Sequence, residues 1–243
     1  MHQIKAVVDL VKAEFMGDHR VYFDLAVHIP IDNFRHIGSA TRTPKGGATP
    51  ASPSHQLERA GADARLTSDK ALVRDASGVV LPGVGHFGTC MANLKLSGLD
   101  EVVREVVSRR QPFLGICVGM QMMFESSEEA PNVPGLGILP GAVRKLPSGL
   151  TRPQMQWNRL DVKKPKCKLL KGIAEETWMY FVHSYAADTD EILVAATCEY
   201  GTSVTALIEL DNIWATQFHP EKSGLDGQKV TRNFVDLLSG SKS

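Results

Sequence analysis

The sequence has no excess of charge of either sign. Its 27 lysine and arginine residues are matched by 27 aspartate and glutamate residues, which gives a formal net charge of zero. A balanced chain lacks the overall field that draws a protein to nucleic acid or to an anionic membrane surface. We therefore expect neither nucleic acid nor a membrane as a partner.

Cysteine is scarce, and long apolar runs are missing. The four cysteines, at positions 90, 117, 167 and 198, show none of the paired spacings typical of zinc or redox sites. No N-terminal apolar core resembles a signal peptide, and no run is long enough to cross a bilayer. These absences favour a cytoplasmic location for this chain of 243 residues and give no sign of a metal or another cofactor.

Alternating strand and helix patterns predict an α/β fold with a mostly parallel central sheet flanked by helices. Apolar residues at helical spacing predict a helix over residues 98–110, and a last helix over residues 227–238. Residues 192–198, 204–210 and 213–218 are expected to form an antiparallel strand meander. Internal repeats are absent.

One cysteine lies in an unusual setting. Residues 115–119 read Gly-Ile-Cys-Val-Gly and follow an apolar strand pattern that begins after Pro112. Flanking glycines permit the sharp strand-to-helix turn of a nucleophile elbow. A helix N-terminus also favours the thiolate form of Cys117. A buried structural cysteine beside turn glycines is the alternative.

A histidine and a carboxylate near the C-terminus could complete a triad with Cys117. In an extended backbone, His219 and Glu221 project to the same face, and Pro220 stiffens the segment between them. His219 would accept the thiol proton, and Glu221 would fix the tautomer of the ring. Alone, such a segment is more often a surface turn.

A third segment suggests an oxyanion hole. The strand pattern at residues 79–81 leads into Pro82 and the turn Gly83, Val84, Gly85, whose backbone N–H groups can face an anion. With the amide of Val118, this turn is the natural donor to a tetrahedral intermediate on Cys117. An ordinary strand-loop junction is the alternative.

These segments occur in the order typical of one family. Residues 82–85 (Pro-Gly-Val-Gly), 115–121 (Gly-Ile-Cys-Val-Gly-Met-Gln), 180–185 (Tyr-Phe-Val-His-Ser-Tyr) and 217–223 (Gln-Phe-His-Pro-Glu-Lys-Ser) resemble the class I glutamine amidotransferases. Within them the chain is most similar to the glutaminase subunits of imidazole glycerol phosphate synthase, a histidine-pathway enzyme. The resemblance extends from about Ser54 to the C-terminus.

The resemblance implies roles for the matching residues. Cys117 would attack the carboxamide of L-glutamine, His219 would protonate the departing ammonia, and Glu221 would orient His219. Residues similar to the family's glutamine contacts are Gly85, Gln121, Glu129, His183, Ser184 and Tyr185. Gln121 also lies one helical turn beyond Cys117. For Glu129, as for Glu128, a solvated helix end is the alternative.

The resemblance further implies a heterodimer with a cyclase subunit, which uses the ammonia to make imidazole glycerol phosphate and AICAR. Residues similar to those near that interface are Trp157, Asn158, Tyr180 and Lys222. Two alternatives remain open from the residues. One is another amidotransferase subunit or a γ-glutamyl hydrolase, and the other is a non-catalytic amidotransferase-like protein.

The chain departs from the family pattern in two places. Residues 153–158 read Pro-Gln-Met-Gln-Trp-Asn where the family usually has Pro-His-Met-Gly-Trp-Asn, and a side chain in place of that glycine is penalised wherever positive φ is required. The family's N-terminal Asp-Tyr-Gly-x-Gly-Asn loop is also missing. We expect an atypical segment over residues 1–53, with a first strand within residues 4–10 and a flexible connector over residues 39–53, before the amidotransferase domain of residues 54–243.

Overall fold

The computed structural model describes residues 27–28 and 52–239 of the chain. The strand expected within residues 4–10 lies outside the described residues, as does the connector up to residue 51. The described part resumes at Ser52, whose side chain accepts a hydrogen bond from His55 N and caps helix α1 (Pro53–Arg59). A proline at the first helical position suits this start, because its fixed φ is already helical.

Among the described residues, the central sheet has eight strands and is mixed. Parallel pairing joins the three central strands, and the outer strands pair antiparallel. The α/β class and the meander of the last three long strands are confirmed, while parallel pairing is confined to the centre. In spatial order the strands are β2 (Arg65–Leu66), β1 (Val27–His28), β3 (Val79–Gly83), β4 (Phe113–Cys117), β13 (Ile213–Thr216), β12 (Ser203–Leu210), β11 (Val194–Glu199) and β8 (Asp161–Val162).

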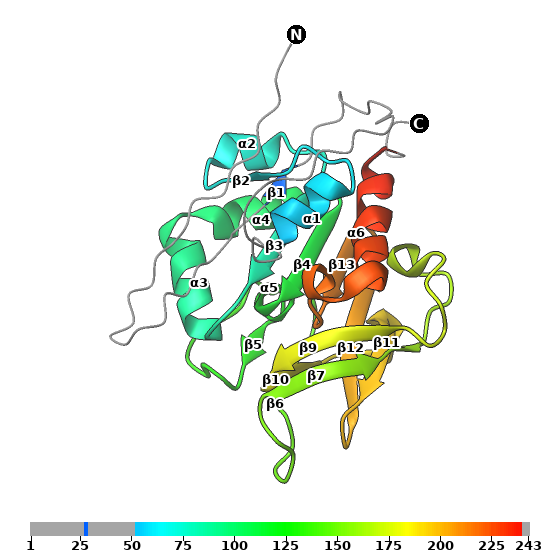
Figure 1. The fold of residues 1–243 in the computed structure, drawn as a ribbon. Coiled ribbons are helices and arrows are strands. Elements are labelled where there is room, and N and C mark those ends of the chain that lie inside the picture. The colour runs from blue at the N-terminus through cyan, green and yellow to red at the C-terminus, as the bar shows by residue number, and fades with distance from the viewer. Residues whose placement is uncertain (1–26, 29–51, 240–243) are drawn as a thin grey trace, which may run out of the picture.

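Two small sheets lie beside the meander (Figure 1). One is the antiparallel pair β7 (Gln154–Arg159) and β9 (Trp178–His183), and the other contains β10 (Tyr185–Asp188), β6 (Ala142–Lys145) and β5 (Ser126–Ser127). Gln156, at the position where the family has glycine, pairs with Phe181 in regular strand geometry. It is not among the described residues with positive φ, so its side chain causes no local strain.

Helix α1 packs beside α6 (Gly224–Ser239), while α4 (Leu99–Ser108) packs beside both α2 (Lys70–Arg74) and α3 (Phe87–Leu96) (Figure 1). Helix α4 confirms the prediction for residues 98–110, because Leu99, Val102 and Val106 form its buried face. No helix in the described part of the chain is both long and apolar enough to cross a membrane. The other helical elements of the described residues are α5 (Val118–Met122) and the 3-10 turns η1 (Lys168–Leu170), η2 (Glu191–Leu193) and η3 (Pro220–Lys222).

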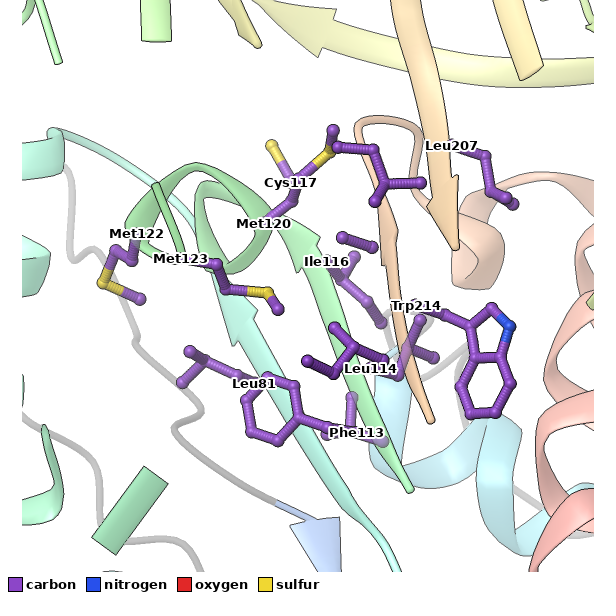
Figure 2. Close-up of a cluster of buried hydrophobic side chains, with 14 of the residues drawn as sticks. Leu81, Phe113, Leu114, Ile116, Cys117, Met120, Met122, Met123, Leu207 and Trp214 are labelled. Carbon is purple, nitrogen blue, oxygen red and sulfur yellow. The ribbon is translucent and has the colours of Figure 1, made fainter. Parts of the chain in front are cut away.

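The three central strands are buried along their whole lengths. Strands covered on both faces need apolar side chains at successive positions, and residues such as Leu81, Leu114 and Trp214 supply them. Figure 2 shows these side chains packed together, with Cys117 at the end of β4 and its sulfur pointing away from them. The core therefore holds the end of β4 rigidly.

The turn from β4 into α5 is strained and tightly packed. Cys117 has φ 54° and ψ −113°, a conformation that non-glycine residues rarely adopt. A Cβ on Gly119 would lie 1.8 Å from the carbonyl oxygen of Leu81 in β3. The second glycine of the elbow is thus required by the close approach of two backbones.

We expect Gly119→Ala to destabilise the protein by at least about 3 kcal/mol, because the added methyl group meets a backbone atom that cannot rotate away. Gly137→Ala is the control. Gly137 has φ 62° but open space around its Cβ position, so only the left-handed backbone opposes that change, at about 1–2 kcal/mol. Urea unfolding followed by circular dichroism measures both. Equal losses for the two variants would contradict the packing explanation.

Candidate active site

A cavity of about 360 Å³ lies where the end of β4, the loop after β3, the end of β9 and the turn η3 meet. It brings together segments that are far apart in the sequence. Its lining contains these predicted residues: Val84, Gly85, Cys117, Val118, Gln121, Glu129, His183, Ser184, Tyr185, His219 and Lys222. Pro153 and Val182 complete the lining. Gly83 and Glu221 line a second cavity of about 60 Å³, which His219 also borders.

His219 and Glu221 form a buried hydrogen-bonded pair. The His219 Nδ1–H donates to Glu221 Oε1 at 2.7 Å, and the two side chains are 3% and 5% exposed. The predicted contact is present, but the predicted extended backbone is wrong, because Pro220 and Glu221 begin the 3-10 turn η3. Proline at the first position of a turn favours helical φ, and this turn brings the carboxylate back to the ring.

The surroundings of His219 favour its protonated form. Burial alone would lower its pKa, but the negative charge of the nearby Cys117 sulfur, together with the Glu221 carboxylate, raises the pKa to about 10. The other ring nitrogen, Nε2, is buried and has no hydrogen-bond partner among the described residues. Since Nδ1 is bound to Glu221, Nε2 is the ring atom that can exchange a proton inside the cavity.

The Cys117 sulfur has two polar neighbours besides the imidazole. It lies 3.9 Å from Val182 O and 3.7 Å from Gln217 Nε2, which donates to it. Gln217 was missed in the sequence analysis. The sequence carries no direct signal for this contact, because it depends on the pairing of Thr216 with Ile116 in the parallel β13 and β4 strands, which places the next residue of each strand beside the other.

The loop after β3 is held by a second cysteine that was also missed. The Cys90 thiol, on α3, donates to Val84 O at 3.5 Å. In a trans peptide the carbonyl and the following N–H point in opposite directions, so the Gly85 N–H points away from α3. Gly85 has φ 96°, which favours glycine at this position. Burial raises the pKa of Cys90 to about 12, so it remains a neutral thiol donor.

A hydrogen-bonded group of side chains forms the far wall of the cavity. Gln121 Nε2 donates to Tyr185 O and to Gln217 Oε1, each at 3.0 Å. His183 Nδ1 donates to the same Tyr185 carbonyl at 2.9 Å. Burial lowers the pKa of His183 to about 4, so its ring is neutral at physiological pH. Gln121 therefore has only its oxygen left to offer a ligand.

The two neighbouring glutamates have different surroundings. Glu129 Oε2 accepts a hydrogen bond from Phe87 N at the start of α3, at 2.6 Å, and Glu129 lines the cavity. Glu128 is exposed and accepts from Lys145 N at 2.9 Å. Both lie in a turn after β5, so the alternative of a solvated helix end is wrong.

Apolar side chains gather on the outer face of the β7 and β9 pair. This face, named the docking face for the role proposed for it below, consists of Met155, Trp157, Trp178 and Tyr180, and the first three are about half exposed or more. The Trp157 and Tyr180 rings lie 6.2 Å apart in an edge arrangement, and Lys222 Nζ lies 5.8 Å from the Tyr180 ring centre.

Asn158 differs from the other residues predicted at an interface. It is buried, and its side chain donates to Glu199 O at 2.8 Å and accepts from Arg159 N at 2.8 Å. Its polar atoms are thus engaged within the chain. We therefore leave Asn158 out of the docking face.

The backbone of Tyr180 joins the docking face to His219 and to Ser223, which flank the turn η3. His219 N donates to Tyr180 O at 3.0 Å, and Tyr180 N donates to Ser223 Oγ at 3.0 Å. Ser223 Oγ in turn donates to His219 O at 2.6 Å. The residue whose ring lies on the docking face is therefore bonded on both sides to the segment that carries His219.

In the part of the chain that the structure describes, no group of three or more histidine, cysteine or acidic side chains could hold a metal ion. The polar side chains around the cavity are instead a thiol, two imidazoles, an amide, a carboxylate, two hydroxyls and an ammonium group. This set is suited to acyl transfer through a sulfur nucleophile.

Comparisons with known proteins agree with this geometry. The family model for glutamine amidotransferase class-I matches residues 55–237. The imidazole glycerol phosphate synthase subunit HisH of Methanothermobacter thermautotrophicus is 46% identical over 79% of this chain and 96% of its own length. The subunit of the same name from Dehalococcoides mccartyi is 42% identical over 81% of this chain and 96% of its own length.

Solved structures show the same fold at low sequence identity. A glutamine amidotransferase crystal structure superimposes with a TM-score of 0.61 at 21% identity, covering 76% of this chain and 91% of its own. A putative GMP synthase subunit from Thermoplasma acidophilum gives a TM-score of 0.57 at 20% identity, covering 81% and 91%. The chain belongs to the class-I glutamine amidotransferase family and, within it, to the family of the HisH subunits of imidazole glycerol phosphate synthase.

Proposed function

We propose that the chain is the glutaminase subunit of imidazole glycerol phosphate synthase. It hydrolyses L-glutamine to glutamate and ammonia and passes the ammonia to a cyclase subunit, which makes imidazole glycerol phosphate and AICAR in histidine biosynthesis. The observation that carries this proposal is the strained Cys117 in one cavity with His219, whose ring is hydrogen-bonded to the buried side chain of Glu221. The names and extensive similarity of the relatives support the assignment to this enzyme.

The chemistry follows from the three residues. The Cys117 thiolate attacks the side-chain carbonyl carbon of glutamine, and the carbonyl electrons move to oxygen. His219, as imidazolium, gives its Nε2 proton to the amide nitrogen, and the carbon–nitrogen bond breaks to release ammonia and a thioester. His219 then removes a proton from water, which attacks the thioester carbon and releases glutamate and the thiolate. Glu221 keeps Nδ1 protonated throughout.

Backbone amides stabilise the oxyanion in this proposal. The Val118 N–H at the start of α5 and the Gly85 N–H, which points away from α3, are the two donors. Gly83 serves differently. Its Cβ position is 2.7 Å from Gly119 N, so a side chain there would push the two loops apart. The oxyanion hole thus depends on a glycine that does not itself line the larger cavity.

Polar groups around the rest of the cavity bind glutamine. Both N–H groups of Gln121 are engaged, so it receives an N–H of the substrate at Oε1. Glu129 offers a carboxylate to the substrate ammonium group, and the segment of His183, Ser184 and Tyr185 forms the opposite wall. The pocket therefore presents acceptors to the cationic end of an amino acid.

The docking face is the surface that receives the cyclase subunit in a cytoplasmic heterodimer. A cluster of exposed tryptophan, tyrosine and methionine side chains is the composition of an interface centre. Lys222 lies over Tyr180 and also lines the cavity, so it connects the face with the active-site mouth. The four cysteines are free, as expected for a compartment that keeps thiols reduced.

Cys117→Ser is expected to lower glutamine hydrolysis by at least about 1,000-fold, since the hydroxyl offers no comparable nucleophile. Glutamate release in the presence of a cyclase subunit measures the loss. Cys167→Ser is the matched control, because Cys167 is equally buried but does not line the cavity. Substantial activity in Cys117→Ser would remove this residue from the mechanism.

Glu221→Gln should move the alkaline limb of the glutaminase pH profile to lower pH, by about one unit or more. The Glu221 carboxylate helps to raise the pKa of His219, so its loss lets the imidazolium deprotonate at lower pH. His183 does not interfere, because it is already neutral above about pH 5, given its pKa of about 4. An unchanged alkaline limb would show that the limb does not report on His219.

Trp157→Ala is expected to weaken binding of the cyclase subunit about tenfold or more, as for an aromatic residue at an interface centre.

Lys222→Ala should lower partner-stimulated glutaminase activity while the melting temperature stays unchanged. Titration calorimetry and a coupled ammonia assay measure the two effects. Leu96→Ala on α3, 89% exposed, is the control. Full activity of the isolated chain would contradict the proposed coupling.

A further inference from the structure

Gln217 contacts the nucleophile from inside the protein. It follows β13 directly, is 0% exposed, and places Nε2 3.7 Å from the Cys117 sulfur. This amide is a neutral donor to the sulfur, in contrast to the charged imidazole of His219. The imidazole also interacts with the sulfur, and against the effect of burial this interaction helps to raise the pKa of the ring to about 10.

Neighbouring groups fix the orientation of the Gln217 amide. Its Oε1 accepts from Gln121 Nε2 at 3.0 Å, and Gln121 also donates to Tyr185 O. Because the Gln121 N–H needs an acceptor, the Gln217 oxygen must face Gln121 and the nitrogen must face the sulfur. The Gln217 backbone is held as well, since its N–H donates to Ala206 O at 2.9 Å.

We propose that Gln217 is a further catalytic residue, which donates a hydrogen bond to the Cys117 thiolate and holds the sulfur in position for attack. The inference rests on the proposed role of Cys117 as the nucleophile. A donor to a thiolate favours the charged form over the neutral thiol. It also restricts rotation about χ1 of Cys117, whose backbone is already fixed by the elbow.

Another part of the chain provides a matched control. Gln154 is also 0% exposed, and its Nε2 lies 3.8 Å from the sulfur of Cys198. The two glutamines therefore make the same kind of buried amide–sulfur contact, but only Gln217 makes it to Cys117. Replacement by methionine removes the donor at either position and keeps an unbranched side chain of similar volume.

The test is the rate at which iodoacetamide alkylates Cys117 as a function of pH between about 6 and 9, the range around the usual thiol pKa, followed by mass spectrometry of the peptide. Burial raises the pKa values of Cys90 and Cys167 to about 12 and of Cys198 to about 11, so these three remain unreactive thiols in this range. We expect Gln217→Met to shift the alkylation profile to higher pH by about one unit, which is about tenfold slower reaction at about pH 7. Gln154→Met should leave the Cys117 profile unchanged.

Steady-state kinetics with the cyclase subunit give a second readout. Gln217→Met should lower kcat about tenfold while KM for glutamine changes less than about threefold, because the lost contact is to the nucleophile rather than to the substrate. A purely space-filling role would instead lower the melting temperature of both methionine variants and leave the Cys117 alkylation profile in place.

A Cys117 profile in folded Gln217→Met that superimposes on the wild-type profile would overturn the inference, as would an equal shift in Gln154→Met. If Gln217→Met does not fold, Gln217→Leu takes its place, since it removes the donor without placing a new charge beside the sulfur. The same shift is expected, and its absence overturns the inference. Alkylation of Cys117 does not require glutamine turnover, so the two proposals can fail separately. If the wild-type protein showed no glutaminase activity but Gln217→Met still shifted the alkylation profile, the proposed function would be refuted and the contact of Gln217 with the sulfur would stand.

Discussion

The close approach of α5 to β3 is the constraint on which the rest of the site depends. Gly119 lies against the Leu81 carbonyl with no room for a methyl group, and Gly83 lies against the Gly119 amide. This contact holds Cys117 in a backbone conformation that it would otherwise avoid. The free energy needed to keep that strain comes from the buried central strands, not from any bond at the nucleophile itself.

The two histidines of the cavity have opposite charge states because their neighbours differ. Both are almost fully buried, which by itself disfavours the imidazolium in each case. His219 keeps its charge because its interactions with Cys117 and Glu221 raise its pKa to about 10, whereas His183 has a peptide carbonyl as its partner and remains neutral. One ring can therefore donate a proton while the other, in the wall of the same cavity, serves as a fixed polar group.

Sequence patterns predicted the elements with strong local signals. The helix over residues 98–110 depends on apolar spacing, and the elbow depends on glycines next to Cys117, so both could be read from the chain alone. The backbone at Pro220 could not, because proline is compatible with extended strands and with the first turn of a helix. The burial of Asn158 and the contact of Gln217 with the sulfur depend on residues that are distant in the sequence, which single-chain patterns do not contain.

The backbone of Tyr180 belongs at once to the docking face and to the hydrogen bonds around His219. If binding of a partner at this face and binding of glutamine in the cavity are coupled through this segment, each must change the affinity of the other by the same factor. A partner that tightens glutamine binding through this strand must itself be held more tightly when the pocket is full. In the proposed heterodimer, glutamine in the pocket would then lengthen the time for which the two subunits stay together.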